Sequence, residues 1–133
     1  MRALLDTDVL IDVALNRVPF AGPAAEVVNW AEDAPGQACI AWHSLSNIAY
    51  LVRPDARTFL QNLLRFVEVA AVGTREAKQA LSFPMNDLED ALQAAAALAF
   101  DAHYIVSRNL NHYRHSPIPA LSPSQFLKVT GRK

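Results

Sequence analysis

The sequence has 133 residues and a formal net charge of −1, and 52% of its residues are hydrophobic and 8% aromatic. This length and composition suit a single domain with a buried core and exclude an intrinsically disordered chain. The balanced charge excludes a uniformly basic surface, so any contact with nucleic acid must come from a local basic patch.

Cysteine content and hydrophobic runs predict a cytoplasmic protein. Cys39 is the only cysteine, so the chain can form no intramolecular disulfide, which suits a reducing compartment. No long apolar run precedes Asp6, so we expect no secretory signal. We also expect no membrane span, because the sequence has no stretch of about 18 uncharged apolar residues.

The first half of the chain alternates short apolar runs with helical patterns. Leu4 and Leu5 form a run that ends at Asp6, which is typical of a buried strand. In chain order, this half is predicted to contain a strand at 2–5, a helix capped by Asp8, a helix at 21–32, a strand at 38–41, a helix from His43 or Ser44, and a helix at 56–66.

The second half continues this alternation. The clearest helix begins at Asp87, because apolar residues recur after it at helical spacing up to Ala99. Ser122 and Pro123 form a cap and first-turn pair that opens a last helix to about Val129. The other predicted elements are a strand at 67–72, a helix at 75–82 capped by Thr74, a strand at 103–107, a polar loop at 109–116 and a strand at 118–121.

Strands that alternate with helices predict an α/β fold, here a three-layer α/β/α sandwich around a parallel sheet of about five strands. We find no linker or repeat, so residues 1–133 are predicted to form one domain. Ligand sites in such sheets lie at the carboxyl ends of the strands. The segments 6–8, 43–47 and 107–109 are therefore the first candidates for a site, and the start of the helix at Asp87 can join them.

Acidic and amide side chains collect at these positions. Asp6 and Asp8 follow the first strand, and Asp87, Glu89 and Asp90 lie in the first turn of the later helix. Crowded carboxylates are costly unless a cation neutralises them, and oxygen ligands suit Mg²⁺ and Mn²⁺. We expect Asp6, Asp90 and Asp87 to bind the metal, although Asp87 is equally suited to capping the helix and Glu89 to solvent. Asp8 is expected to cap its helix, with a role as metal ligand as the alternative.

Two asparagines accompany the acids. Asn47 and Asn109 follow the second and fourth predicted strands, and each is either a site residue or an ordinary turn or helix-surface residue. The loop after the fourth strand is basic and contains Tyr113. Its candidate substrate-binding residues are Ser107, Arg108, His112 and Arg114, with arginine for phosphates and Tyr113 for stacking on an unpaired base. The alternative interpretation of this segment is a solvated loop.

Four segments together resemble the PIN-domain family from the first residues to about Leu127. They are residues 4–12 (LLDTDVLID), 87–96 (DLEDALQAAA), 104–113 (YIVSRNLNHY) and 116–123 (SPIPALSP). Each motif is weak alone, but their order and spacing match the family. The resemblance implies a Mg²⁺- or Mn²⁺-dependent ribonuclease, and more narrowly a VapC-like toxin of a toxin–antitoxin pair.

The resemblance also implies catalytic positions and partners. Of the four acidic residues that the family usually uses, the first falls at Asp6 and the third at Asp90. The second and fourth fall at Asn47 and Asn109, where an amide offers an oxygen but no charge. Implied partners are an RNA substrate, a small antitoxin and a second copy of the chain, which we expect to dimerise through the helices at 21–32 and 44–52.

The two amides leave a second hypothesis open. A PIN domain with a reduced acidic set can bind RNA or a protein partner without cleaving RNA. The pair Asp6 and Asp8 also resembles that of haloacid-dehalogenase-type phosphotransferases. That family, however, expects Thr where Leu10 stands and paired acids where Ser107 and its neighbours lie.

Overall fold

The computed structural model describes residues 1–132. Its elements are β1 (Ala3–Leu5), α1 (Thr7–Ala14), α2 (Ala21–Asp33), β2 (Ala38–Ile40), α3 (Trp42–Leu51), α4 (Ala56–Leu63), β3 (Glu68–Val69), α5 (Thr74–Ser82), α6 (Leu88–Ala99), β4 (Tyr104–Val106), the 3-10 helix η1 (Leu110–Tyr113), β5 (Ala120–Leu121) and α7 (Pro123–Val129). Among these residues no helix has the length and apolar character needed to cross a membrane.

The strands form one parallel sheet in the order β3-β2-β1-β4-β5. β1 is central, with Leu4 opposite Cys39 of β2 and Leu5 opposite Val106 of β4. The chain builds β2 and β3 on one side of β1 and then β4 and β5 on the other. Ligands of open parallel sheets bind beyond the carboxyl ends of strands at such a reversal. The expected α/β/α fold with a five-stranded parallel sheet is confirmed.

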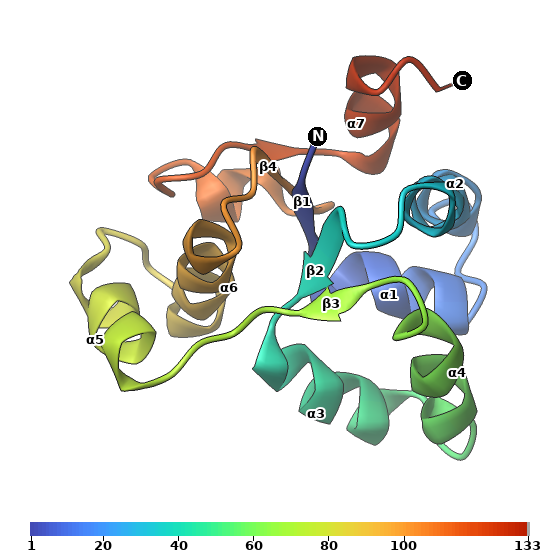
Figure 1. Cartoon of the computed structure of the whole chain (residues 1–133), viewed down its shortest axis with the longest axis horizontal. Helices are drawn as coiled ribbons and strands as arrows, with labels where there is room; N and C mark the ends of the chain where they lie inside the picture. The colour runs from blue at the N-terminus through green and yellow to red at the C-terminus, as the bar shows by residue number, and fades with distance from the viewer. Residues whose placement is uncertain (133) are drawn as a thin grey trace.

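Alternate strand residues face opposite sides, so helices cover both faces of the sheet. Ala3 and Leu5 enter the larger core, which contains residues of α1, α2, α3, α4 and α7. Leu4, between them, enters the smaller core formed with α6, and α5 packs against α6. Figure 1 shows α5 and α6 on one side of the strands and α1, α2, α4 and α7 on the other.

The outer strands are shorter than predicted. β3 stops at Val69, within the predicted 67–72, because its partner β2 ends at Ile40 and the ladder needs a neighbouring strand. β5 starts at Ala120, because Pro119 before it has no N–H to donate to a ladder. The two edge strands of the sheet are therefore shorter than the three strands at its centre.

Several helix ends also differ from the prediction. The expected Asp8 cap of α1 is wrong: Asp6 caps this helix, and Thr7 N donates to Asp6 Oδ1 at 2.7 Å. Thr74 is the first residue of α5 rather than its cap. The predicted caps of the last two helices are confirmed, because Asp87 accepts from Asp90 N and Ser122 accepts from the N–H of the third helical residue.

The aromatic pair Trp30 and Phe126 fastens the C-terminal helix to α2. Phe126 is 0% exposed, and its ring lies 4.8 Å from that of Trp30 in an edge-to-face arrangement. Trp30 also belongs to the larger core and is 8% exposed. Edge-to-face pairs add to the stabilisation from area burial.

We predict that Phe126→Ala lowers the free energy of unfolding by about 3–5 kcal/mol, because it opens a cavity in the larger core. The measurement is urea denaturation followed by circular dichroism. Val129→Ala, on an exposed part of the same helix, is the control and should change stability by less than about 0.5 kcal/mol. Equal losses for both variants would contradict the packing described here.

Candidate functional site

Asp6 is the centre of the polar cluster at the carboxyl end of β1. Its side chain is 6% exposed, and each of its oxygens accepts hydrogen bonds. Oδ1 accepts from Thr7 N, whereas Oδ2 accepts from Ser107 Oγ at 2.7 Å and from Tyr113 Oη at 2.9 Å. Burial raises the pKa of Asp6, while these donors and His43 oppose the shift. The carboxylate is therefore held by neutral donors.

Tyr113 joins the two acids that the sequence placed first. The Tyr113 hydroxyl lies 2.9 Å from Asp6 Oδ2 and 3.4 Å from Asp90 Oδ1. Burial, followed by the charges of both acids, raises the pKa of the phenol well above its usual range, so it remains a hydrogen-bond donor. The expectation that Tyr113 stacks on an unpaired base is wrong, because its side chain is only 3% exposed.

Asp90 lies in the first turn of α6, behind the Asp87 cap. Asp90 N donates to Asp87 Oδ1 at 3.1 Å, so the cap fixes the turn that carries Asp90. Burial, then the charges of Asp87 and Asp6, raise the pKa of Asp90. His112 Nδ1 lies 3.0 Å from Asp90 Oδ2 and forms an ion pair when protonated, although the geometry is not that of a hydrogen bond.

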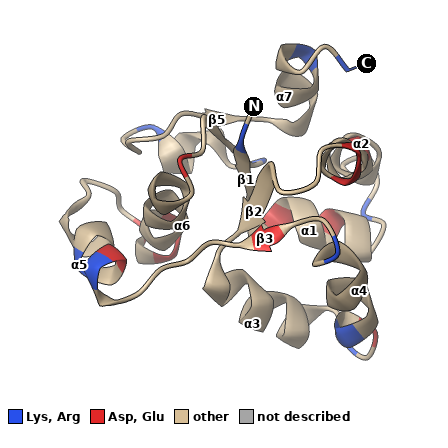
Figure 2. Cartoon of the chain, in the orientation of Figure 1, with Lys and Arg blue, Asp and Glu red and all other residues tan. Residues whose placement is uncertain are grey.

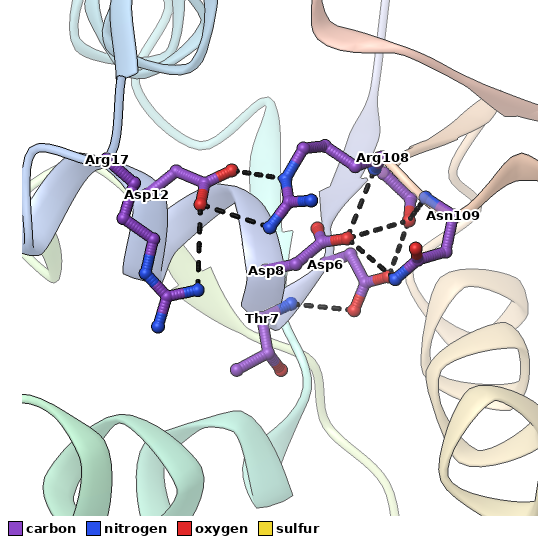
Figure 3. A network of polar contacts seen from close by, with 8 residues as sticks. Asp6, Thr7, Asp8, Asp12, Arg17, Arg108 and Asn109 are labelled. Atoms are coloured by element: carbon purple, nitrogen blue, oxygen red, sulfur yellow. Dashed lines mark hydrogen bonds and ion pairs between the residues drawn. The ribbon is translucent and has the colours of Figure 1, made fainter. Parts of the chain in front are cut away.

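Asp8 lies beside Asp6 in the first turn of α1 (Figure 3). Its Oδ2 accepts from Asn109 Nδ2 at 3.0 Å and from Arg108 N at 3.2 Å. Its Oδ1 is buried and has no hydrogen-bond partner within residues 1–132. Burial, then repulsion from Asp6, raises the pKa of Asp8 to about 7. Hydrogen bonds thus hold Oδ2 of this carboxylate, whereas Oδ1 accepts none from the described residues.

The structure places Asn47 on α3, opposite the start of α6. Asn47 Nδ2 donates to Glu89 Oε1 at 2.6 Å. Glu89 was expected to point to solvent, and although it is exposed, this bond ties it to the site. Both asparagines therefore donate to a carboxylate on a neighbouring element.

Arg108 is held away from the carboxylates of Asp6 and Asp90. Its guanidinium donates to both oxygens of Asp12, at 2.6 and 3.2 Å, and lies 4.1 Å from the centroid of the Phe20 ring. The hydrogen bond to Asp12 is the main reason that the pKa of Arg108 is raised. Figure 3 shows Arg108 between Asp12 and Asp8, with Arg17 on the far side of Asp12. This guanidinium is therefore committed to an internal ion pair, in contrast to its expected role at a phosphate.

The remaining substrate candidates lie in two places, one buried against Asp6 and the other at an open pocket. Ser107 is 0% exposed and serves Asp6 rather than the surface. His112 and Arg114 line an open pocket of about 440 Å³ together with Met85, Asn86, Asp87, Asn111 and His115. Because His112 also contacts Asp90, this polar pocket opens directly beside the acidic cluster.

A buried hydrogen-bond network that was not predicted from the sequence joins the helices of the site. Gln93 Nε2 donates to Thr7 Oγ1 and to Ser44 Oγ, both at 3.1 Å, and the two hydroxyls lie 2.7 Å apart. The three residues belong to α6, α1 and α3, so they fix the helices that carry Asp90, Asp8 and Asn47. The sequence signal that could have predicted this network is Gln93, a polar residue among the alanines of an apolar helix.

The donor set fits a hard divalent cation. Carboxylate oxygens of Asp6, Asp8 and Asp90 gather here, and Asp8 Oδ1 and Asp90 Oδ2 are buried without a hydrogen bond from the described part of the chain. Residues 1–132 contain no group of three or more His, Cys, Asp or Glu side chains placed to hold a metal ion. Mg²⁺ does not require one, because it is usually held by one or two carboxylates, waters and substrate phosphates.

The fold and site define a three-layer α/β protein with an acidic centre at the carboxyl ends of its central strands; acidic segments begin both α1 and α6 (Figure 2). The sequence profile of the PIN domain matches residues 2–111. The chain therefore belongs to the PIN-domain family. No curated protein sequence matches it.

Solved structures share the fold at low sequence identity. VapBC2 from Rickettsia felis, bound to a DNA fragment from its promoter, has a TM-score of 0.70 at 15% identity, covering 92% of this chain and 98% of that one. A toxin–antitoxin complex from Klebsiella pneumoniae has a TM-score of 0.69 at 19% identity, covering 91% and 97%. VapBC-1 from nontypeable Haemophilus influenzae has a TM-score of 0.61 at 12% identity, covering 93% of this chain and 99% of that one.

The raised carboxylate pKa values predict how stability depends on pH without metal. The pKa of Asp8 is about 7 in the folded protein and 3.8 in the reference state, so the folded form holds more protons between these values. The free energy of unfolding in EDTA should therefore fall as pH rises from about 4 to 7, by up to about 1.4 kcal/mol per pH unit for each proton retained.

The measurement is urea denaturation in EDTA across this pH range. Asp8→Asn removes one of the responsible groups, so its stability should depend less steeply on pH than that of the unmodified protein. Equal slopes for the two proteins, or a stability that rises with pH in the unmodified protein, would contradict the assignment.

Proposed function

We propose that this PIN domain is a Mg²⁺- or Mn²⁺-dependent endoribonuclease that acts in the cytoplasm as the toxin of a toxin–antitoxin pair. The observation that carries the proposal is the convergence of Asp6 and Asp90 on the Tyr113 hydroxyl, at the carboxyl ends of β1 and β4. Their charges repel one another, and a cation removes that cost.

Asp6 and Asp90 would hold the cation, with Asp87 at the cap of α6 as a further candidate. When bound, the metal lowers the pKa of a coordinated water and stabilises charge on the phosphodiester. Ser107 and Tyr113 orient Asp6 by donating to Oδ2. Because both donors are neutral, they fix the carboxylate without cancelling the charge that attracts the cation.

RNA would enter from the pocket beside Asp90. His112, Arg114 and His115 offer donors for phosphate oxygens, and Asn86 and Asn111 offer amides for the edge of an unpaired base. Arg108 serves here by holding the segment after β4 against α1, through Asp12. The site then has an acidic half on α1 and α6 and a basic half on η1 and the loop after it.

Partner binding is supported by the relatives and by one exposed surface. The similar solved structures include toxin–antitoxin complexes, which supports a small antitoxin as a partner. On α3, Trp42 is 68%, Tyr50 69% and Leu51 49% exposed. The apolar residues of α2 are largely buried, so among the helices expected to form the homodimer we assign the contact to α3.

We predict that the antitoxin-free protein cleaves RNA in Mn²⁺ and Mg²⁺ and that EDTA abolishes cleavage. Asp6→Asn and Asp90→Asn keep the shape of each side chain but remove its charge, so each should reduce the rate by about 100-fold or more. The measurement is single-turnover cleavage of a panel of single-stranded and structured RNAs. Glu32→Gln, an exposed acid on α2, is the matched control and should cleave at the normal rate.

Two outcomes would oppose the nuclease function. Cleavage that persists in both Asp→Asn variants would indicate a contaminating enzyme or another site. RNA binding without cleavage by the folded, metal-loaded protein would favour the second hypothesis, a PIN domain that binds RNA or a protein and does not cut.

We predict that the exposed face of α3 forms the homodimer. Trp42→Glu and Tyr50→Glu place charges in an apolar contact and should convert the dimer to monomer at micromolar concentration, as measured by light scattering after gel filtration. Leu81→Glu on α5 is equally exposed, at 69%, and should leave the dimer intact. Dimers in both α3 variants, or a monomeric unmodified protein, would exclude this interface.

A further inference from the structure

Both asparagines of the site act as hydrogen-bond donors to carboxylates. Asn109 Nδ2 lies 3.0 Å from Asp8 Oδ2, and Asn47 Nδ2 lies 2.6 Å from Glu89 Oε1. An amide nitrogen has no lone pair for a cation, so through Nδ2 each asparagine holds an acid. In both pairs the acid comes from a helix other than the element that carries the amide.

The environment of Asp8 is asymmetric. On Oδ2, three donors converge: Asn109 Nδ2, Arg108 N and, at 3.4 Å, Ser107 Oγ. Oδ1 is buried, yet the described residues offer it no partner. Buried polar atoms are nearly always satisfied, so a fixed carboxylate with one unsatisfied oxygen indicates that a ligand completes it.

Asp8 also adjoins the cation site of the proposed function. Ser107 Oγ contacts Oδ2 of both Asp6 and Asp8, at 2.7 and 3.4 Å, so the two carboxylates meet at one hydroxyl. Within residues 1–132 no positively charged side chain is hydrogen-bonded to either carboxylate, since the Arg108 guanidinium is bonded to Asp12. A second acid at this point adds repulsion that a divalent cation would relieve.

We propose that Asp8 is a metal-binding carboxylate of this site, and that Asn109 and Asn47 position the carboxylates of Asp8 and Glu89. The negative charge expected at the end of β4 is thus supplied from the first turn of α1. Glu89 brings a charge beside Asn47 in the same way. The acidic set is moved to neighbouring helices rather than lost.

This inference rests on the proposed metal site, and its test does not depend on RNA cleavage. The competing interpretation is that Asp8 only fastens the loop after β4 through Arg108 N and Asn109. The two roles predict opposite effects of the Asp8 carboxylate on the stability of the metal-free protein. A fastening residue stabilises the metal-free protein, whereas a metal-binding acid destabilises it and stabilises the loaded protein.

The experiment measures Mn²⁺ binding by calorimetry and by electron paramagnetic resonance, with thermal unfolding in EDTA as the check of folding. Asp8→Asn should weaken Mn²⁺ binding by about tenfold or more, without lowering Tm in EDTA. The exchange variant Asp8→Asn with Asn109→Asp returns the charge from across the 3.0 Å contact. It should recover affinity to within about threefold of the unmodified protein.

Asn109→Ala keeps the carboxylate of Asp8 but removes its main side-chain donor. It should weaken Mn²⁺ binding less than Asp8→Asn does, as expected for a positioning residue. Glu32→Gln controls for the loss of an acid far from the site and should bind Mn²⁺ normally.

Three results would overturn the inference. Unchanged Mn²⁺ affinity in Asp8→Asn would reduce Asp8 to a fastening residue, while leaving the proposed nuclease function intact. An exchange variant no better than Asp8→Asn would show that charge at this point is not what binds the cation. An unmodified protein that binds no Mn²⁺ would remove both this inference and the metal dependence of the proposed function.

Discussion

Repulsion among carboxylates that are buried or half-buried is the constraint on which the rest of this structure depends. Asp6, Asp8 and Asp90 lie at the carboxyl ends of the central strands, and burial together with neighbouring charge raises the pKa of Asp8 and of Asp90. A chain that only had to fold would not gather acids at that point. The surrounding contacts are those needed to hold these groups together while leaving their charge available.

Neutral donors meet this need. Hydroxyls of Ser107 and Tyr113 and the amide of Asn109 orient the carboxylates, whereas the arginine nearest to them is bonded to Asp12 instead. In the interior next to the site, Gln93 of α6 links α1 and α3 by donating to the buried hydroxyl groups of Thr7 and Ser44. Because buried networks of this kind fix geometry, the helix starts that carry the acids cannot drift apart when the charges repel.

The fold could be predicted from the sequence because its signals are local. Apolar runs, helical spacing and the caps at Asp87 and Ser122 each lie within a few residues of the element they define. The narrow strands β3 and β5 were overestimated, since strand length depends on a partner elsewhere in the chain. Local patterns thus determined the order of elements better than their extent.

The interior of the site could not be predicted in the same way, because its contacts join distant positions. Tyr113 reaches Asp6 across 107 residues and Arg108 reaches Asp12 across 96. From the sequence, both were polar loop residues available to substrate. Only the parallel pairing of β1 with β4 brings their loop against α1. There the Tyr113 hydroxyl donates to Asp6, and Arg108 forms an ion pair with Asp12.

This arrangement gives the site two unlike sides. On the α1 side, Arg108 is neutralised by Asp12, so the local field near Asp6 and Asp8 remains negative and favours a cation. On the η1 side, His112 and Arg114 line the adjacent pocket and offer N–H donors there. In the proposed function, a polyanionic substrate would be repelled by the first side until a cation is bound there. Under the proposed function, metal binding would therefore be the step on which productive binding of such a substrate depends.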